Sequence, residues 1–479
     1  MTIQVPSHIF RGYDLRGLVG SELTDETVAA IAQGYATWLL QRRIYDCVVG
    51  YDCRISSPHF SKIVIKTLND AGITVYDIGM TLSQIIYFAC YYFRTRGMIM
   101  ITASHNPKEY NGFKFGTGYS ETMLTDEIIE LRELVQSGQR SSKAEQFLSR
   151  KEKGKHISED IKEEYIQDVL RRIDPVGKVK VVVDSCAATT GLFLPELLRR
   201  AGCEVIEQNT KPDGNFPVGT PDPTEHEVLE RLGKGVVQAK ADLGFAYDAD
   251  GDRLGIVDSD GTPIWNDVLV SLFAQDVLDF MPGSKIIFNT LCSKQVADVV
   301  KAKGGKPVIW LTGHSFIKAK VREERAPFGG ELSGHMYFVD NFYGHDDGAI
   351  ASLRILAYLT RKQQTLKQAV QQLPQYVSSP EIKVGTPDEI KFKLVSETIG
   401  GKLKKLYPNG EFLEIDGVRV DMQDSMAIVR ASQNGPYLTV KFEAKTQSEY
   451  DQMKKDISAL LHECSEIDFS SGVNTSALL

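Results

Sequence analysis

The sequence has little cysteine, and no two of its seven cysteines have the C-x-x-C spacing of a zinc site or a redox motif. Their odd number and wide scatter also argue against a disulfide framework, so we expect reduced, mostly buried thiols in a cytoplasmic protein. No run of about 18 apolar residues occurs, and the N-terminal segment lacks the apolar core of a signal peptide. We therefore expect no membrane partner.

An excess of positive charge is also missing, because 55 Lys and Arg stand against 63 Asp and Glu, a formal net charge of −8. Without a global basic field we expect no nucleic-acid partner. Small phosphorylated substrates remain compatible, since they need only a local cluster of cationic side chains. The 479 residues predict roughly three or four domains at 100–200 residues each.

Strand and helix patterns alternate through most of the chain. Short apolar runs at residues 47–50, 98–101, 179–184, 243–247 and 285–289 predict buried parallel strands with helices on both faces of the sheets. A polar stretch at residues 137–156 is interpreted as a linker. After about Pro380 the pattern changes, with an Asp416-Gly417 hairpin turn and an alternating, half-buried strand at residues 437–445. This last part is predicted to be α+β with antiparallel strands.

Residues 102–107 (TASHNP) follow the apolar strand 98–101. In open α/β sheets, reactive groups lie in loops at the carboxyl ends of strands, so Ser104 would have a rigid strand behind it and substrate in front. The alternative is a strand-to-helix turn in which Ser104 or Asn106 is an N-cap. On this motif alone, the two interpretations are about equal.

Residues 248–253 (DADGDR) place Asp248, Asp250 and Asp252 at alternate positions directly after a strand. Such carboxylates can converge on one hard cation such as Mg²⁺. An EF-hand loop is excluded, because it needs glycine at its sixth position and glutamate at its twelfth, where this sequence has Arg253 and Ser259. A solvated acidic turn is the alternative, but three carboxylates beside one arginine repel each other strongly without a cation.

Two glycine-containing loops come later in the chain. Residues 329–335 (GGELSGH) offer Glu331 and Ser333 as partners for sugar hydroxyls, although a plain glycine-rich turn is the first interpretation of this motif alone. Residues 430–436 (RASQNGP) combine a guanidinium, a hydroxyl and side-chain amides, which suits an anion. A hairpin loop with an incidental arginine is an equally good interpretation.

These motifs together resemble the α-D-phosphohexomutase family. TASHNP, DADGDR, GGELSGH and a late Arg-Ala-Ser loop occur in this order over the whole chain, and residues 10–17 (FRGYDLRG) resemble the start of the bacterial phosphomannomutase/phosphoglucomutase branch. The resemblance implies three consecutive α/β mixed-sheet domains and a C-terminal α+β domain around a central cleft. The implied domains are residues 1–154, 155–260, 261–378 and 379–479, each contributing one loop.

The resemblance also implies roles for individual residues. Ser104 would carry and recover a phosphoryl group and complete a Mg²⁺ site formed by Asp248, Asp250 and Asp252. The other implied catalytic residues are Arg16, His105, Lys114 and His314, with Lys114 and His314 as acid/base candidates. Tyr13, Glu331, Ser333 and His335 would bind the sugar. The residues implied to bind phosphate are Arg253, Arg430, Ser432, Gln433 and Asn434.

The implied activity is the reversible interconversion of hexose 1-phosphate and hexose 6-phosphate, with mannose, glucose or both as the sugar. It would run through a phosphoserine enzyme and a hexose 1,6-bisphosphate, with glucose or mannose 1,6-bisphosphate as activator. Alternatives are a phosphoglucosamine mutase, a Mg²⁺-dependent sugar phosphatase or a non-catalytic sugar-phosphate-binding protein. The chain departs from the family pattern at residues 433–435, and at Leu291, where some relatives place a phosphate-binding lysine.

Overall fold

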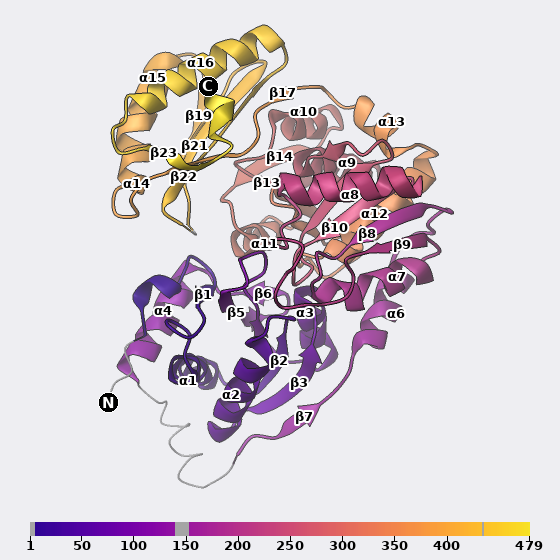
Figure 1. Ribbon diagram of the computed structural model, residues 1–479, viewed down its shortest axis with the longest axis vertical. Helices are drawn as coiled ribbons and strands as arrows, with labels where there is room; N and C mark the ends of the chain where they lie inside the picture. The colour runs from indigo at the N-terminus through magenta and orange to yellow at the C-terminus, as the bar shows by residue number, and fades with distance from the viewer. Residues whose placement is uncertain (1–4, 139–152, 434) are drawn as a thin grey trace. The chain divides into compact units, whose positions relative to one another are not determined.

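The structure, a computed structural model, describes residues 5–138, 153–433 and 435–479 (Figure 1). Most of the predicted linker and the predicted phosphate ligand Asn434 lie outside the described residues. The chain divides into two compact units, Met1–Asn266 with Ser333–Lys367 (unit 1) and Asp267–Leu332 with Gln368–Leu479 (unit 2). Among the described residues, no helix combines the length and the apolar character that crossing a membrane requires.

The first sheet of unit 1 has the strand order β1-β5-β4-β2-β3-β7, with β6 paired to β5. Strands β2, β3, β4 and β7 are parallel, whereas β5 runs antiparallel to β4 and β1. The strands are β1 Leu15–Leu18, β2 Asp46–Tyr51, β3 Thr74–Met80, β4 Gly97–Ile101, β5 Tyr110–Gly118, β6 Glu121–Thr122 and β7 His156–Ser158. The helices are η1 Ser7–Ile9, α1 Asp25–Gln41, α2 Ser57–Asp70, α3 Ser83–Tyr92 and α4 Thr125–Ser137.

The second sheet of unit 1 has the order β12-β11-β10-β8-β9, in which β8, β9 and β10 are parallel and β11 and β12 antiparallel. Its strands are β8 Lys180–Asp184, β9 Glu204–Gln208, β10 Leu243–Tyr247, β11 Leu254–Asp258 and β12 Pro263–Ile264. Strand β16, Met336–Phe338, also belongs to unit 1. The helices are α6 Lys162–Arg172, η2 Thr189–Leu192, α7 Leu194–Arg200, α8 His226–Ala239 and α12 Gly348–Lys362.

Unit 2 contains the third and fourth sheets. In the third, β13 (Lys285–Asn289) lies between β14 (Lys306–Trp310) and β15 (Phe328–Gly330) and is parallel to both. The accompanying helices are α9 Asn266–Phe280, α10 Lys294–Ala302, α11 His314–Glu323 and α13 Leu366–Gln371. The predicted strands at residues 98–101, 179–184, 243–247 and 285–289 are therefore present within a residue or two.

The fourth sheet has the order β19-β20-β21-β22-β18-β23, with β17 paired to β22, and its neighbouring strands are antiparallel. The pairing of β19 with β20 confirms the predicted hairpin at Asp416-Gly417. The strands are β17 Val377–Ser378, β18 Ile382–Gly385, β19 Glu411–Leu413, β20 Val418–Asp421, β21 Ser425–Ala431, β22 Tyr437–Ala444 and β23 Asp468–Val473. The helices are α14 Lys391–Lys393, η3 Leu394–Ile399, α15 Gly400–Leu406, α16 Gln447–His462 and η4 Thr475–Leu478. The predicted fold class, three α/β domains followed by an α+β domain, is confirmed.

The strand predicted at residues 437–445 is present as β22, but the prediction that it is half-buried is wrong. Strand β22 is buried on both faces, because its polar side chains meet polar groups around the third sheet. Lys441 Nζ donates to Asp267 Oδ2 at 2.5 Å, and Glu443 Oε1 accepts from Ser293 Oγ at 2.8 Å. Alternation of apolar and polar residues indicates two different faces, but it does not say that the polar face meets water.

The seven cysteines are all free and buried, which confirms the expectation of buried thiols. Desolvation by burial raises the pKa of Cys90 to about 12, so this thiol is not ionised near neutral pH.

Gly112 lies in β5 between β1 and β4, where the backbones approach closely. A Cβ at this position would lie 2.1 Å from the carbonyl oxygen of Leu15 and 2.9 Å from that of Thr102. Neither backbone can move without disturbing the sheet or the Ser104 loop, defined as residues 102–110.

Gly112→Ala is therefore expected to lower the free energy of unfolding by about 1–3 kcal/mol, the usual cost of overpacking. Urea denaturation followed by circular dichroism measures this change. The matched control is Gly401→Ala in α15, where a Cβ meets nothing within 4 Å and alanine should be neutral or slightly stabilising. Equal stability of the two variants would contradict the close approach.

Candidate active site in unit 1

Ser104 follows β4 in a loop that leads into β5, so no helix starts here and the alternative of a helix N-cap is excluded. The residue is buried and has a left-handed backbone conformation with φ of 49°. Its amide donates to Thr102 Oγ1 at 2.8 Å, and its hydroxyl donates to Asp248 Oδ2 at 2.6 Å. His105 Nδ1 lies 3.2 Å from the same hydroxyl oxygen. The loop thus holds the serine hydroxyl against the acidic motif.

Asp248, Asp250 and Asp252 lie in the loop between β10 and β11, and all three are fully buried. One oxygen from each carboxylate lies within 4.8 Å of one from each of the other two. Gly251 permits this turn, since its φ is +79° and a Cβ would lie 2.9 Å from Thr190 Cγ2 and 3.0 Å from Gln84 Nε2. Because all three aspartates are fully buried, the alternative of a solvated acidic turn is wrong.

The three carboxylates fit a divalent cation. Oδ2 of Asp250 accepts from Ser83 Oγ at 2.5 Å and from Lys114 Nζ at 2.7 Å, but Oδ1 is buried and has no hydrogen-bond partner among the described residues. A buried carboxylate oxygen normally has a partner, and hard oxygen ligands are what Mg²⁺ or Ca²⁺ prefers. Burial, followed by the charges of Asp252 and Asp250, raises the pKa of Asp248 well above its usual value.

Cationic side chains surround this acidic loop. Lys114, on β5, lies 2.7 Å from Asp250 and 2.5 Å from Asp252. Burial alone would lower the pKa of Lys114, but Asp250 and Asp252 outweigh it and raise the pKa well above its usual value. An ammonium held in this way donates hydrogen bonds and cannot accept a proton. Lys114 is thus suited to act as a base only when another cation binds the carboxylates of Asp250 and Asp252 in its place.

Two arginines lie at the edge of the same group. Arg16 donates to Asp14 Oδ2 at 2.9 Å and to Asn106 Oδ1 at 2.6 Å, so it contacts the Ser104 loop directly. Arg253 donates its amide to Asp248 Oδ1 at 3.2 Å, and its guanidinium lies 3.6 Å from Asp222. Burial lowers the pKa of both guanidinium groups, but nearby negative charges, chiefly Asp14 at Arg16 and Asp222 at Arg253, outweigh this effect, so both pKa values are raised. Tyr13 lies near both arginines.

Besides Tyr13, two of the predicted sugar ligands lie in unit 1. His335 Nε2 is 3.3 Å from Asp252 Oδ1, and its Nδ1 is 2.9 Å from Ser333 Oγ. Asp346 lies 3.9 Å from His335, and Asp252, His335 and Asp346 form a second group with metal-ligand spacing. The structure therefore brings Ser104, the three aspartates, Lys114, His335 and Ser333 into one polar cluster.

The remaining predicted residues lie in unit 2. Glu331 is buried and accepts from the amide of Gly313, directly before His314 at the start of α11. Arg430 Nε donates to Asp416 Oδ2 at 3.0 Å. Ser432, which directly follows β21, is buried. Gln433 is partly exposed beside it. Asp416 Oδ2 also accepts from Thr290 Oγ1 at 2.9 Å and from the amide of Thr312 at 3.0 Å.

Comparison with known proteins agrees with these motifs. Three consecutive segments match the models of phosphoglucomutase/phosphomannomutase α/β/α domains I, II and III, at residues 7–141, 163–261 and 265–377. The chain belongs to the phosphoglucomutase/phosphomannomutase family. It is 36% identical over 450 residues to a phosphomannomutase/phosphoglucomutase of Pseudomonas aeruginosa, covering 94% of each chain.

Other members of the phosphoglucomutase/phosphomannomutase family are nearly as similar. A phosphoglucomutase of Neisseria gonorrhoeae is 33% identical over 453 residues, covering 95% of this chain and 96% of the relative. A crystal structure of a phosphoglucomutase/phosphomannomutase family protein from Burkholderia thailandensis superimposes with a TM-score of 0.86 at 32% identity, covering 96% of this chain and 98% of that one. Relatives of this kind are enzymes by name, so the chain is placed in a family of mutases.

In this family member, the sequence analysis missed several residues that support the predicted site residues within each unit. They are Asp52 and Arg54 after β2, Ser83 at the start of α3, and Asp416 in unit 2. Strands β2 and β4 are parallel neighbours, so the loop that follows β2 and the Ser104 loop lie at the same edge of the first sheet. The rule that places reactive groups at that edge could have found Asp52 and Arg54 had the strand order been known.

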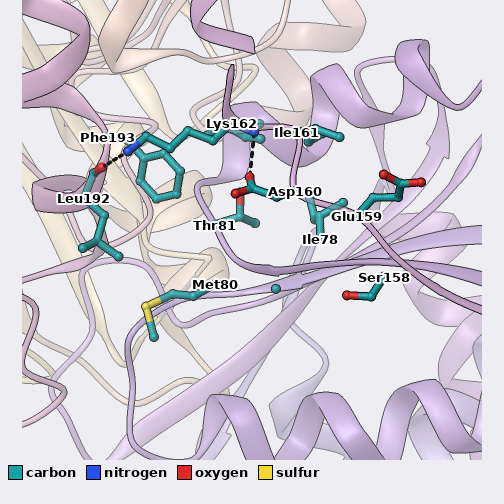
Figure 2. A pocket seen from close by; sticks show the side chains of 12 residues that line it. Ile78, Met80, Thr81, Ser158, Glu159, Asp160, Ile161, Lys162, Leu192 and Phe193 are labelled. Atoms are coloured by element: carbon teal, nitrogen blue, oxygen red, sulfur yellow. Dashed lines mark hydrogen bonds between the residues drawn. The ribbon is translucent and has the colours of Figure 1, made fainter. Parts of the chain in front are cut away.

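A separate pocket of about 430 Å³ lies in unit 1 where the end of β3, the start of α6 and the η2–α7 connection meet. Figure 2 shows its wall of mixed apolar and polar side chains, which includes Met80, Phe193 and Asp160, with Lys162 Nζ donating to the Leu192 carbonyl at 2.7 Å. None of the predicted site residues lines this pocket. It is therefore distinct from the polar cluster around Ser104.

If the acidic loop is a divalent-cation site, Mg²⁺ at about a hundred times its Kd should raise the free energy of unfolding by about 2.7 kcal/mol, because the unfolded chain would not form that site. Asp250→Asn should remove most of this stabilisation. Urea unfolding with Mg²⁺ and with EDTA measures it. Asp260→Asn serves as control, since Asp260 is exposed and pairs with Lys367. The same Mg²⁺ effect in Asp250→Asn as in the native chain would rule out the site.

Proposed function

We propose that the chain interconverts hexose 1-phosphate and hexose 6-phosphate, with mannose, glucose or both as the sugar. Ser104 would be the phosphoryl carrier, and a hexose 1,6-bisphosphate the intermediate. The observation that supports this most is the buried Ser104 hydroxyl at 2.6 Å from Asp248, inside a cluster of three aspartates and a lysine. A protein that only binds sugar phosphates needs no such nucleophile.

Asp248, Asp250 and Asp252 would hold Mg²⁺, with an oxygen of Ser104 or its phosphate completing the site. When bound, this ion would neutralise charge on the transferring phosphoryl group. Arg16 and His105 would add positive charge around the phosphoserine, whose phosphate contributes about −1.5 to −2. Positioning and charge neutralisation are the main sources of catalysis in phosphoryl transfer.

In the first half-reaction the bond between phosphorus and Ser104 Oγ breaks while a bond forms to the free hydroxyl of the substrate. The proton of that hydroxyl passes to a base, for which His314 and Lys114 are the candidates. The bisphosphate then returns its other phosphoryl group to Ser104, giving the isomeric monophosphate. A chain without phosphate on Ser104 would need glucose or mannose 1,6-bisphosphate as activator.

The substrate would be bound by residues from the whole chain. The sugar hydroxyls would be contacted by Tyr13, Glu331, Ser333 and His335. The phosphate that is not transferred would be held by Arg253, Arg430, Ser432, Gln433 and Asn434. We propose that residues 1–154, 155–260, 261–378 and 379–479 each supply one of these loops, and that the enzyme acts in the cytoplasm.

Incubation with glucose 1-phosphate, Mg²⁺ and trace glucose 1,6-bisphosphate should give glucose 6-phosphate without release of inorganic phosphate. Ser104→Ala should abolish turnover and labelling of the protein by the bisphosphate. The control is Ser185→Ala, which removes another buried serine at the end of a parallel strand. Net phosphate release that survives Ser104→Ala would support the phosphatase alternative instead. Parallel rates with mannose and glucosamine 1-phosphates would establish the sugar preference.

Arg430→Lys should raise KM for the hexose phosphate roughly tenfold or more with a smaller effect on kcat, since lysine lacks the planar fork that binds phosphate. The substitution keeps a positive charge opposite Asp416. Steady-state kinetics measure the effect, and Arg361→Lys, at an exposed ion pair with Asp174, is the control. An unchanged KM would remove Arg430 from the binding site.

A further inference from the structure

Arg54 is a fully buried arginine in the loop after β2, and its guanidinium binds the backbone of the Ser104 loop. One terminal nitrogen donates to the carbonyl oxygens of Ser104 at 2.6 Å and Asn106 at 2.7 Å. The other donates to the carbonyl oxygens of Pro107 at 2.8 Å and Tyr110 at 3.1 Å. A single side chain therefore binds four carbonyl groups of one loop.

Asp52 completes this network by accepting hydrogen bonds from both Arg54 and Thr102. Its Oδ2 accepts from Arg54 Nε at 3.1 Å and from Thr102 Oγ1 at 2.7 Å. The oxygen of Thr102 in turn accepts the amide of Ser104 at 2.8 Å. The peptide group before Ser104 and the carbonyl group after it are thus both connected to the Arg54–Asp52 pair.

The backbone at Ser104 needs such support. A non-glycine residue with φ of 49° is in a sparsely populated conformation, which costs free energy and persists only where surrounding contacts hold it. Carbonyl groups that converge on one point also repel each other unless a donor lies between them. A guanidinium offers five donors in a fixed plane, whereas an ammonium offers three on a flexible chain.

We propose that Arg54, together with Asp52, is the positioning group that holds Ser104 Oγ against the acidic loop for phosphoryl transfer. This inference rests on the proposed function of Ser104. Arg54 binds main-chain atoms of the loop and not the Ser104 hydroxyl, so its effect on the reaction is exerted through the loop backbone. Displacing a reacting atom by about 1 Å costs roughly 100-fold in rate, which sets the size of the expected effect.

The test measures phosphorylation of Ser104 by glucose 1,6-bisphosphate in Arg54→Lys, using rapid quench and intact-protein mass spectrometry. In this step a bond forms from Ser104 Oγ to phosphorus as the bond from phosphorus to a sugar oxygen breaks, and the serine proton leaves to the sugar oxygen by way of a base. We expect the rate of phosphorylation and kcat to fall together by roughly 100-fold, with KM within about twofold of the native value.

The matched control is Arg231→Lys. Arg231 also pairs with an aspartate at a strand end, Asp184 at 2.8 Å, and donates to a backbone carbonyl, that of Val218. A loss of melting temperature in both variants with a loss of kcat only in Arg54→Lys supports the proposal. An equal loss of kcat in both, or a change in KM alone, overturns it.

A second variant covers the case in which Arg54→Lys does not fold. Thr102→Val is nearly isosteric and removes the hydroxyl that joins Asp52 to the amide of Ser104, so we expect phosphorylation to slow by roughly tenfold with little change in KM. A native rate of phosphorylation in Thr102→Val overturns the proposal. If the native chain itself takes up no phosphoryl group on Ser104, the proposed function fails. That outcome is seen in the native chain alone, so it is distinguished from a failure of the Arg54 proposal, which appears only in the variants.

Discussion

Three aspartate carboxylates buried within 4.8 Å of one another repel strongly, and the structure of unit 1 around them is arranged to offset that repulsion. Lys114 from β5 donates to two of the carboxylates, whereas Ser83 from the start of α3 and Ser104 from the loop after β4 each donate to one. The ends of elements from the first and second sheets therefore meet at the acidic loop. One cation fewer would leave buried negative charge without compensation, which is far costlier than a lost surface ion pair.

Unit 2 uses the same principle with a different geometry. Asp416 accepts from Arg430 of the fourth sheet and from the Thr290 and Thr312 region of the third, so a single buried carboxylate joins the two sheets. Arg419 adds to this junction by donating to the carbonyl oxygens of Thr290 and Cys292. The loop that would bind phosphate and the loop that carries His314 are thus connected through hydrogen bonds.

Much of the fold could be predicted because apolar runs and turn residues are local signals. The strand predicted at residues 98–101 and the hairpin predicted at Asp416-Gly417 follow directly from such patterns. The polar face of β22 could not be predicted in the same way, since Lys441 and Glu443 are covered by residues far away in sequence. A pattern records the chemistry of a face and not what lies against it.

The candidate site divides along the same line. The sequence by itself determined the chemical groups: a serine after a buried strand, three alternating carboxylates after another, and an order of motifs that belongs to one family. Only the tertiary structure decided that Lys114 lies between two of the aspartates, that Arg54 holds the backbone of the Ser104 loop, and that Asp416 binds Arg430. The reason is that these contacts depend on strand order and crossing loops, which long-range packing sets and local sequence does not encode.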